Sequence, residues 1–325
     1  MPKVVVTDHR FGSLALERSI LEPLGCEVID AQCTSEAPLV GALKGIEYVI
    51  TQFAPLTAPV IETLDRCRLI VRYGVGVDNV DLEAARRKGI PVCNVPDYCM
   101  DEVADHALAL ILTLTRQIAA ISNHVREGFW KLPGRLEQMR VLKEMTVGLV
   151  GFGRIGREVA HRLKAFKCRI LVFDPVVPAA DIERAGYAAA DFDLVLRTSD
   201  LITLHCPSTA QTRRMINAGS FALMKRGALF VNVARGDLVR TDDLVAALKW
   251  AQLDGAALDV ADPEPLPKDH PLLQMNNVLV TNHVAAASVT AIKTLRSRAA
   301  GAVTCAVRGE PLPNVVNGVT QNSRV

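Results

Sequence analysis

The sequence has almost no net charge, few aromatic residues and no long apolar run. Its 37 basic and 35 acidic residues leave a formal charge of +2, which gives no long-range field to recruit nucleic acid or anionic lipid. No stretch approaches the ~18 apolar residues of a spanning helix, and the first ten residues are too short an apolar segment for a secretory signal. We therefore expect a cytoplasmic protein that acts on small molecules, without nucleic-acid or membrane partners.

The chain also lacks the cysteine patterns of disulfide frameworks and zinc sites. Its eight cysteines are scattered, with no C-x-x-C pair and no histidine at metal-ligand spacing. We expect reduced thiols that mostly fill apolar space, and no bound metal.

What is present is an alternation of strands and helices, and it occurs twice. Continuous apolar strands separated by helix-length segments are typical of parallel sheets with helices on both faces. At 325 residues, the chain is long enough for two α/β domains with separate cores. Strands are expected at 3–8, 26–30, 48–51, 69–74 and 91–95, and again at 146–150, 169–174, 201–205, 228–233, 255–260 and 277–282.

Two apolar helices connect these repeats. Residues 101–130 predict one long bridging helix with Asp101 as its cap. A last helix, over about residues 285–307, ends at Gly309 with Pro311 and Pro313 behind it. We expect this helix to return to the first domain, so the predicted domains are residues 1–99 with 285–325, and residues 100–284.

A glycine-rich turn links the strand at 146–150 to a helix. In that context Gly151 permits a tight turn, Gly153 lets the backbone approach a pyrophosphate, and Gly156 lets helix and strand pack closely. The helix N-terminus would supply amides to the phosphates. The motif consists of Gly151, Phe152, Gly153, Arg154, Ile155 and Gly156.

The next strand ends in Asp174, eighteen residues after the motif. The glycines alone would also fit a turn in any α/β protein, but strand, motif, helix, strand and acid in this order predict a dinucleotide site. Asp174 would accept hydrogen bonds from the adenosine ribose and repel a 2′-phosphate, which favours NAD over NADP.

Three ionisable residues follow later strands of the same domain: Arg235, Glu264 and His283. Ligands of open α/β sheets bind at the carboxyl ends of strands. Alone, each residue also fits a structural role as an ion-pair former, a solvated acid or a core histidine. Together they suit 2-oxo acid reduction. Arg235 would bind the carboxylate and carbonyl oxygen, His283 would donate a proton, and Glu264 would keep the imidazole charged.

The sequence resembles the D-isomer-specific 2-hydroxyacid dehydrogenase family over nearly its whole length. The shared motifs are GFGRIG with Asp174, NVARGDLV, LDVADPEPLP with HPLL, NVLVTNH, and RYGVGVDNVDLEAARRKGIPVCNVPDY with EVADHALALIL. RYGVGVDNVD and VCNVPDYC with DEVADHAL look most like the branch that contains the C-terminal-binding corepressor proteins. The resemblance implies a Rossmann domain inserted into a flavodoxin-like domain, active as a homodimer.

The resemblance also assigns site residues. It places the catalytic residues at Arg235, Glu264 and His283, and the nicotinamide amide against Asp259. It places substrate contacts at Arg72 and at a loop whose backbone N–H groups bind the substrate carboxylate, Tyr73, Gly74, Val75 and Gly76. Further cofactor contacts would be Val75, His205, Cys206, Pro207, Thr212, Val233, Ala234, Arg235, His283 and Ala285.

Four positions depart from the family pattern. Asn282 stands where proline usually precedes the catalytic histidine, Ala261 replaces a common aromatic residue, Ser208 replaces leucine, and Ala286 replaces the tryptophan of the corepressor branch. These changes leave the substrate open, because the ionisable trio is intact. The alternatives are a reductase of glyoxylate-like, hydroxypyruvate-like or larger 2-oxo acids, a short phosphoglycerate dehydrogenase, and an NAD-sensing binding protein with little turnover.

Three further residues have simpler interpretations. Cys206 lies beside the predicted nicotinamide, but a reactive thiol needs a lowered pKa and an exposed electropositive setting. We interpret it as a non-reactive contact. His106 and Trp130, on or beside the long helix, are expected to be packing or dimer-interface residues.

Overall fold

In the computed structural model, which describes residues 1–134 and 136–319, the chain forms two compact units. The first consists of Met1–Tyr98 and the described part of Ser288–Val325, and the second, Cys99–Ala287, is inserted into it. These bounds lie one and three residues from the predicted ones. The difference has a local cause, because Cys99 and Ser288 are the N-cap residues of helices that belong to different units.

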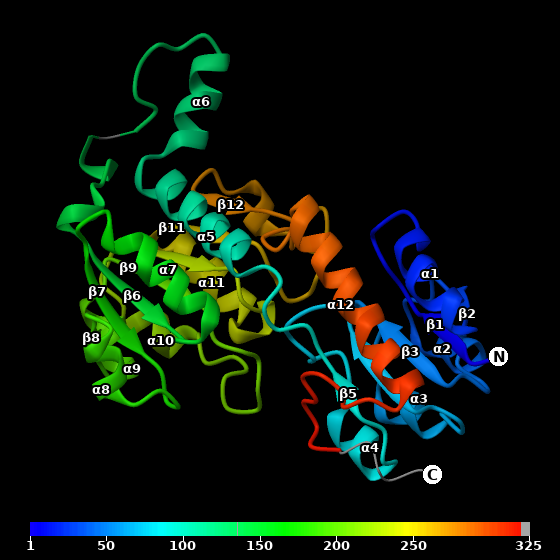
Figure 1. Cartoon of the computed structure of the whole chain (residues 1–325). Helices are drawn as coiled ribbons and strands as arrows, with labels where there is room; N and C mark the ends of the chain where they lie inside the picture. The colour runs from blue at the N-terminus through cyan, green and yellow to red at the C-terminus, as the bar shows by residue number, and fades with distance from the viewer. Residues whose placement is uncertain (135, 320–325) are drawn as a thin grey trace. The chain divides into compact units, whose positions relative to one another are not determined.

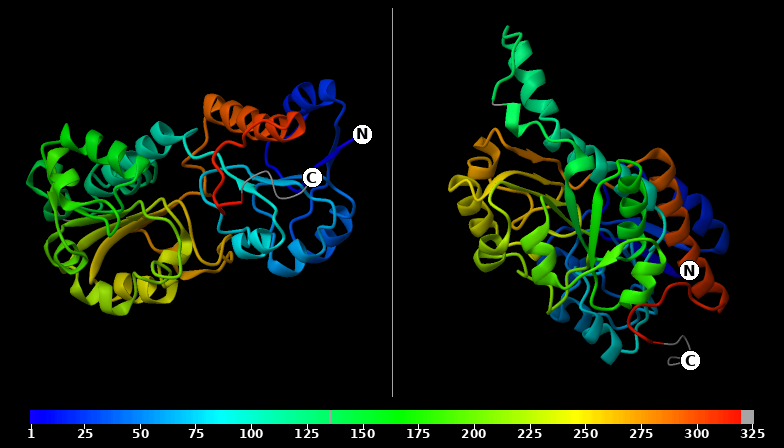
Figure 2. Two further views of the ribbon diagram at one scale, coloured as in Figure 1. Left: turned by 60° about the horizontal axis from the view of Figure 1, so that its bottom comes forward. Right: turned by 90° about the vertical axis from the view of Figure 1, so that its left-hand side faces the viewer.

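The first unit is built on a five-stranded parallel sheet of order β2-β1-β3-β4-β5. β3 and β4 are buried along their whole length, because helices pack on both faces of the sheet, α1 and α12 side by side on one of them (Figure 2). The elements of this unit (Figure 1) are β1 (Lys3–Val6), α1 (Ala15–Leu21), η1 (Glu22–Leu24), β2 (Glu27–Asp30), α2 (Glu36–Ala42), β3 (Tyr48–Thr51), α3 (Ala58–Glu62), β4 (Leu69–Arg72), α4 (Leu82–Arg87), β5 (Val92–Cys93) and α12 (Val289–Arg308).

The second unit is built on a seven-stranded parallel sheet of order β12-β11-β10-β9-β6-β7-β8. Its elements are α5 (Met100–Thr115), α6 (Ile118–Arg126), η2 (Leu136–Gln138), η3 (Leu142–Glu144), β6 (Thr146–Val150), α7 (Arg154–Lys164), β7 (Arg169–Phe173), α8 (Ala179–Arg184), β8 (Ala188–Ala189), α9 (Phe192–Thr198), β9 (Leu201–Leu204), α10 (Ala218–Leu223), β10 (Ala228–Asn232), η4 (Gly236–Leu238), α11 (Thr241–Lys249), β11 (Leu253–Leu258), η5 (Pro271–Gln274) and β12 (Val278–Val280).

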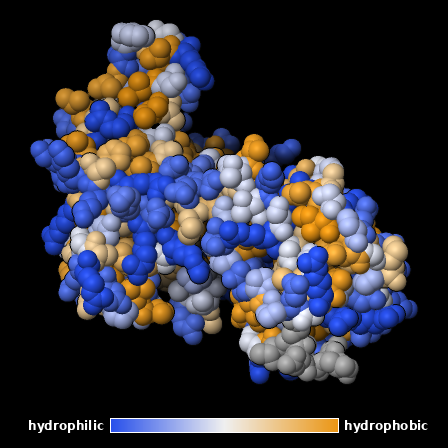
Figure 3. All heavy atoms as spheres, in the orientation of Figure 1, coloured by the Kyte–Doolittle hydropathy of each residue, from blue (hydrophilic) through white to orange (hydrophobic). Residues whose placement is uncertain are grey.

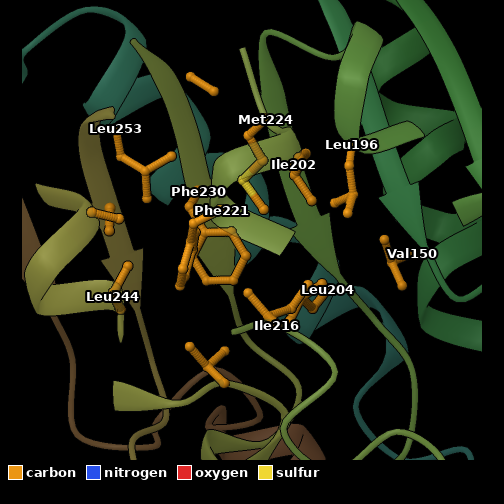
Figure 4. Close-up of a cluster of buried hydrophobic side chains, with 14 of the residues drawn as sticks. Val150, Leu196, Ile202, Leu204, Ile216, Phe221, Met224, Phe230, Leu244 and Leu253 are labelled. Carbon is orange, nitrogen blue, oxygen red and sulfur yellow. The ribbon is translucent and has the colours of Figure 1, made fainter. Parts of the chain in front are cut away.

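The strand order places a switch point in the middle of this second sheet. From β6 the chain runs outward through β7 and β8 on one side, and through β9 to β12 on the other. A crevice for ligands forms at such a point, beyond the carboxyl ends of the strands. Beneath it lies an apolar core, in which the rings of Phe221 and Phe230 meet edge to face with centroids 5.8 Å apart (Figure 4).

The prediction of one long helix over residues 101–130 is wrong. The segment forms α5 and α6, which meet at an angle of 61°. Gln117 has a φ of 50°, and the Thr115 hydroxyl donates to the carbonyl of Ile111 at 2.9 Å. The Thr115 carbonyl accepts from the N–H of Arg140, so a distant segment takes the place of the next helical turn. Among the described residues no single helix is long and apolar enough to cross a membrane, although this bent pair reaches that length and composition together.

The two predicted helix ends at the domain boundaries differ in outcome. Asp101 does not cap α5, because the helix begins at Met100 with Cys99 as its N-cap residue. The Asp101 carboxylate, inside the first turn, binds the guanidinium of Arg162 on α7 at 2.6 Å. α12 does end at Gly309, which has the expected left-handed φ of 70°. Its start is later than predicted, because the Ser288 side chain caps it by accepting from the N–H of Ala291.

One segment of the second unit exposes many apolar side chains. We call residues 118–134 and 136–141, which include α6, the arm. α6 extends away from the sheet in Figure 2, and Figure 3 shows apolar side chains over it. The exposed apolar side chains of the arm are Ile118, Val125, Phe129, Trp130, Leu132, Leu136 and Val141.

Candidate functional site

The glycine-rich turn sits where β6 passes into α7. Gly151 has a φ of 98°, and a Cβ there would lie 2.6 Å from the backbone nitrogen of Cys206. A Cβ on Gly156 would lie 2.1 Å from the carbonyl oxygen of Gly151. The tight turn and the close packing of helix on strand therefore both require glycine. At Gly153, by contrast, a Cβ would meet nothing within 4 Å, so space beside this residue is open to a ligand.

The N-terminus of α7 faces this turn. Gly153 is its N-cap residue and offers no side-chain cap, and Arg154 and Ile155 begin the helix. The first N–H groups of a helix lack partners within it and carry its positive dipole, which suits a phosphate. Phe152 is buried, and the guanidinium of Arg157 lies 4.3 Å from its ring centroid.

Asp174, at the end of β7, joins the turn to the following loop. Its Oδ2 accepts from the N–H of Phe152 at 2.7 Å, and its Oδ1 accepts from those of Val176 and Val177 at 2.8 and 3.0 Å. A carboxylate can accept about four hydrogen bonds. The half-exposed Asp174 therefore keeps about one acceptor position for the predicted ribose contact, and its first role is to fix the turn.

The loop after β9 carries two groups whose protonation is set by burial. Burial lowers the pKa of His205 to about 3, so the imidazole is neutral, and its Nε2 lies 2.9 Å from the Thr203 hydroxyl. Burial raises the pKa of Cys206 to about 11. The Cys206 thiol is therefore protonated at neutral pH, in agreement with its interpretation as a non-reactive contact.

The same loop is closed by side-chain hydrogen bonds. The Thr212 hydroxyl donates to the carbonyl of Pro207 at 2.6 Å and accepts from the N–H of Thr209 at 2.8 Å. Ser208, one of the four departures, donates to the Asp237 carboxylate at 2.7 Å. Ser208 therefore links this loop to the segment that follows Arg235.

The three predicted catalytic residues come from three neighbouring strands. Arg235 follows β10, Glu264 follows β11 and His283 follows β12, and these strands are adjacent in the sheet. Nδ1 of His283 lies 2.8 Å from Oε1 of Glu264, with the two side chains 24% and 35% exposed. The predicted acid and imidazole are therefore in contact through Nδ1 of the ring.

The backbone of Arg235 is fixed by a residue that sequence reasoning missed. The amide of the buried Asn232 donates to the carbonyl of Arg235 at 2.7 Å and accepts from the N–H of Ala234 at 3.0 Å. Val233, the other predicted cofactor contact here, is 8% exposed. The sequence shows no sign of this role, because an asparagine inside an apolar strand only interrupts the hydrophobic pattern and does not indicate what its side chain binds.

The loops that carry Arg235 and Glu264 pack directly on one another. A Cβ on Gly236 would lie 1.9 Å from the carbonyl oxygen of Ala261, so only glycine permits this approach. The Thr241 hydroxyl also donates to the carbonyl of Asp262 at 2.5 Å. These contacts hold the segment after β10 against the segment after β11.

Asp259 is buried, and its carboxylate accepts hydrogen bonds from other groups of the protein. Its side chain is 1% exposed, and its oxygens accept from the Thr281 hydroxyl and from the N–H groups of Val284 and Ala285. Its backbone carbonyl accepts from the N–H of His283. The structure thus gives Asp259 a role in shaping the histidine turn, and its contact with the nicotinamide amide stays a prediction.

The predicted substrate loop belongs to the first unit, at the end of β4. The Tyr73 N–H donates to the Thr51 carbonyl and the Gly74 N–H to that of Arg72, at 2.7 and 2.9 Å. These two N–H groups are therefore used by the fold, and the predicted carboxylate contact rests on Val75 and Gly76. Arg72 is 8% exposed and lies over Gly74, where a Cβ would fall 1.6 Å from its Nη1.

Tyr73 points into the core and contacts a buried ion pair that the sequence did not reveal. Its hydroxyl donates to Glu17 at 2.8 Å, and Glu17, fully buried, also binds Arg296 of α12. Burial and the neighbouring Glu17 raise the pKa of Tyr73 well above its ordinary value. Burial alone would raise the pKa of Glu17, but the hydrogen bonds from Arg296 and Tyr73 outweigh it and lower that pKa.

No metal centre forms among the described residues, where no three or more His, Cys, Asp and Glu side chains gather in a metal-binding arrangement. All eight cysteines are free thiols.

Comparison with known proteins identifies relatives of the whole arrangement. The sequence model "D-isomer specific 2-hydroxyacid dehydrogenase, NAD binding domain" matches residues 108–285. A D-3-phosphoglycerate dehydrogenase of Archaeoglobus fulgidus is 38% identical over 90% of this chain, which spans 55% of that relative's length. A glyoxylate reductase of Korarchaeum cryptofilum is 37% identical over 87% of this chain and 86% of its own.

A solved structure shows the same fold. D-lactate dehydrogenase of Aquifex aeolicus, crystallised with NAD and lactic acid, is 28% identical and superposes with a TM-score of 0.86 over 95% of this chain and 96% of its own.

Proposed function

Because the chain belongs to the D-isomer-specific 2-hydroxyacid dehydrogenase family, we propose that it is an NAD-dependent oxidoreductase acting on a small 2-hydroxy or 2-oxo acid. The observation that carries this proposal is the 2.8 Å contact between Glu264 and His283 at the carboxyl end of the sheet. The residues fit a dinucleotide, since open space at Gly153 lies beside the N-terminus of α7. A bound nicotinamide would supply or accept the hydride.

The protein's own groups would handle the proton and the substrate charge. When the carbonyl carbon of a 2-oxo acid receives the hydride, Nε2 of His283 donates a proton to the carbonyl oxygen, which becomes the hydroxyl. Glu264, bound at Nδ1, fixes the ring and stabilises the imidazolium before transfer. Arg235 would bind the substrate carboxylate through paired hydrogen bonds. In the oxidative direction His283 accepts the same proton.

The first experiment is an assay of cofactor oxidation or reduction across a substrate panel. Glyoxylate, hydroxypyruvate and longer 2-oxo acids are tested with NADH, and 3-phosphoglycerate and lactate with NAD. Glyoxylate, phosphoglycerate and lactate occur in the names of the relatives. His283→Gln should lower kcat by about 10²-fold or more while NADH binding is retained. His161→Gln, an exposed histidine on α7, is the control. Full turnover in His283→Gln would overturn the mechanism.

We also propose that the enzyme prefers NAD to NADP. The support is the position of Asp174 at the end of β7, because a carboxylate beside the adenosine ribose would repel a 2′-phosphate. The kcat/KM for NADH should exceed that for NADPH by about 10-fold or more, and Asp174→Ser should narrow the ratio. A wild-type enzyme that uses NADPH equally well would refute this preference.

Finally, we propose that the protein is a homodimer formed through the arm. The arm exposes a large set of apolar side chains, among them Trp130 at 91% and Leu136 at 70% exposure, and patches of this kind favour protein interfaces. Trp130→Glu should convert the species seen by light scattering to a monomer. Trp250→Glu, at a tryptophan 81% exposed at the end of α11, should leave the mass unchanged. A monomeric wild type would refute the proposal.

A further inference from the structure

We infer that Thr281 and His106 are positioning residues for His283 and act on it through the buried carboxylate of Asp259. The inference rests on the proposed function, in which His283 holds the transferred proton. All four residues lie in the second unit, on α5, after β11 and after β12. Neither Thr281 nor His106 was expected to have a part in the site.

The starting observation is the backbone of His283. Its φ is 57°, in the left-handed region that side chains with a Cβ rarely adopt. Such a conformation persists only where the surroundings hold it in place. The His283 imidazole can meet Glu264 at 2.8 Å only while this turn is kept, so the groups that hold the turn also set the geometry of the pair.

Asp259 holds the turn from both sides of the histidine. Its carbonyl accepts from the N–H of His283 at 2.8 Å. Its Oδ1 accepts from the N–H of Val284 at 3.0 Å, and its Oδ2 from that of Ala285 at 2.9 Å. A single residue therefore orients three consecutive N–H groups, and any rotation of its carboxylate would move the backbone that carries the imidazole.

The orientation of the Asp259 carboxylate is in turn fixed by Thr281. The Thr281 hydroxyl donates to Oδ1 at 2.5 Å, which leaves its oxygen free to accept. Nε2 of His106 lies 3.1 Å from that oxygen and 3.6 Å from Oδ1 of Asp259. Because the hydroxyl proton points to the carboxylate, the network assigns the proton of His106 to Nε2.

The result is a directed chain of hydrogen bonds from α5 to the histidine turn. It runs from His106 Nε2–H to the Thr281 hydroxyl, then to Asp259, whose carboxylate holds the N–H groups of Val284 and Ala285. Its inner member is 1% exposed and its outer member 23% exposed. Polar groups in such a buried network are mutually dependent, so loss of one hydroxyl in the middle should loosen the segment that follows.

The decisive variants remove or restore the hydroxyl of residue 281 while the side chain keeps nearly the same size. Thr281→Val should lower kcat by about 10-fold, while KM and the NADH dissociation constant change by less than about 3-fold, because a small displacement of a reacting group penalises the chemical step. Thr281→Ser restores the hydroxyl and should recover kcat to within about 2-fold. The control is Thr115→Val on α5, where the lost hydroxyl bonds only within its own helix and kcat should be unchanged.

The same logic applies to the outer residue. His106→Gln keeps a donor near the position of Nε2 and should retain most of kcat, whereas His106→Met removes the donor and should lower kcat by about 3- to 10-fold. A purely structural role predicts a different pattern, in which both Thr281→Val and Thr115→Val lower the melting temperature and neither lowers kcat in the folded enzyme. That pattern would overturn the inference.

A readout that needs no turnover separates this inference from the proposed function. Histidine side-chain NMR of the wild-type protein should show His106 protonated at Nε2, and the His283 resonance is assigned by its loss in His283→Gln. Thr281→Val should shift or broaden the His283 resonance, and Thr115→Val should not. If the wild type turns over no substrate, the proposed function fails while this measurement still decides the positioning role, and an unshifted His283 resonance in Thr281→Val refutes it.

Discussion

Replacing Gly156 or Gly153 of the nucleotide turn by alanine should have different effects, on the stability of the fold in the first case and on NADH affinity in the second. A Cβ on Gly156 would lie 2.1 Å from the carbonyl oxygen of Gly151, where ordinary contact begins at 3.4 Å. Helix and turn must therefore separate by more than an ångström. Overpacking of this kind costs about 3 kcal/mol, and the better helix propensity of alanine offsets about 1 kcal/mol. We expect Gly156→Ala to be destabilised by a net of about 2 kcal/mol.

Gly153→Ala should behave in the opposite way. A Cβ there meets no atom within 4 Å, so the folded protein should lose about 1 kcal/mol or less, the cost of alanine at an N-cap. The same methyl group would occupy the space in which the pyrophosphate is expected. A steric cost of about 1–3 kcal/mol in the complex corresponds to about a 5- to 150-fold loss of NADH affinity.

Both variants are measured by urea unfolding without nucleotide and by fluorescence titration with NADH. The two variants should differ in which property they lose. Gly156→Ala should lose stability, and Gly153→Ala should lose NADH affinity at nearly wild-type stability. NADH binding by Gly153→Ala within about 2-fold of the wild type would show that the phosphates do not lie beside this residue. Unchanged stability in Gly156→Ala would show that the close packing of α7 on the turn is not a constraint.

Three further outcomes follow from single contacts. Glu264→Gln should lower kcat by about 10²-fold with NADH binding retained, because a neutral amide stabilises the His283 imidazolium less, and an unchanged kcat would contradict this role. Glu17→Gln should destabilise the protein by about 3 kcal/mol at neutral pH by leaving Arg296 unpaired. Because the folded-state pKa of Glu17 is lowered, its contribution is complete above about pH 4.5 and is lost as the pH falls through that lowered pKa. The difference in unfolding free energy between the wild type and Glu17→Gln, measured in urea, should therefore shrink in acid. A difference that does not change with pH would contradict this role of Glu17. Cys206, with a pKa of about 11, should be alkylated on the order of 100-fold more slowly than an ordinary thiol in mildly alkaline buffer, as followed by mass spectrometry.

Much of the fold could be predicted because its parallel strands are buried on both faces and read as apolar runs. β3 and β4 have no exposed residue. β3 coincides with the expected strand at 48–51, and β4 begins where expected but ends two residues before the predicted end at 74. β8 gave no such signal, because Ala188–Ala189 is a two-residue edge strand. The break at Gln117 was also invisible, since residues on both sides keep a helical apolar pattern. The break depends on a hydrogen bond from Arg140, more than twenty residues away.

The site could be predicted as residue types but not as a network. Gly151 and Gly156 follow from a short motif whose spacing has a geometric reason. Asn232, Thr281 and Glu17 could not be found in this way, because each acts through a partner fixed only by tertiary structure. A polar residue inside or just beyond an apolar run carries no local sign of whether it holds a backbone, another side chain or nothing.

The errors in strand length point to the same conclusion. Expected strands at 201–205, 228–233, 255–260 and 277–282 overrun the observed ladders at their carboxyl ends, where β9, β10, β11 and β12 stop at residues 204, 232, 258 and 280. The overrun residues include His205, Val233, Asp259 and Thr281. The N–H groups of His205, Asp259 and Thr281 still bond to the last residues of the neighbouring strands, Val150, Asn232 and Leu258. Their side chains make separate contacts, His205 with the Thr203 hydroxyl and Thr281 with the Asp259 carboxylate. In a parallel sheet, therefore, polar residues at the last hydrogen bond of a strand are the ones to test first, since their side chains lie at the carboxyl edge of the sheet, where ligands bind.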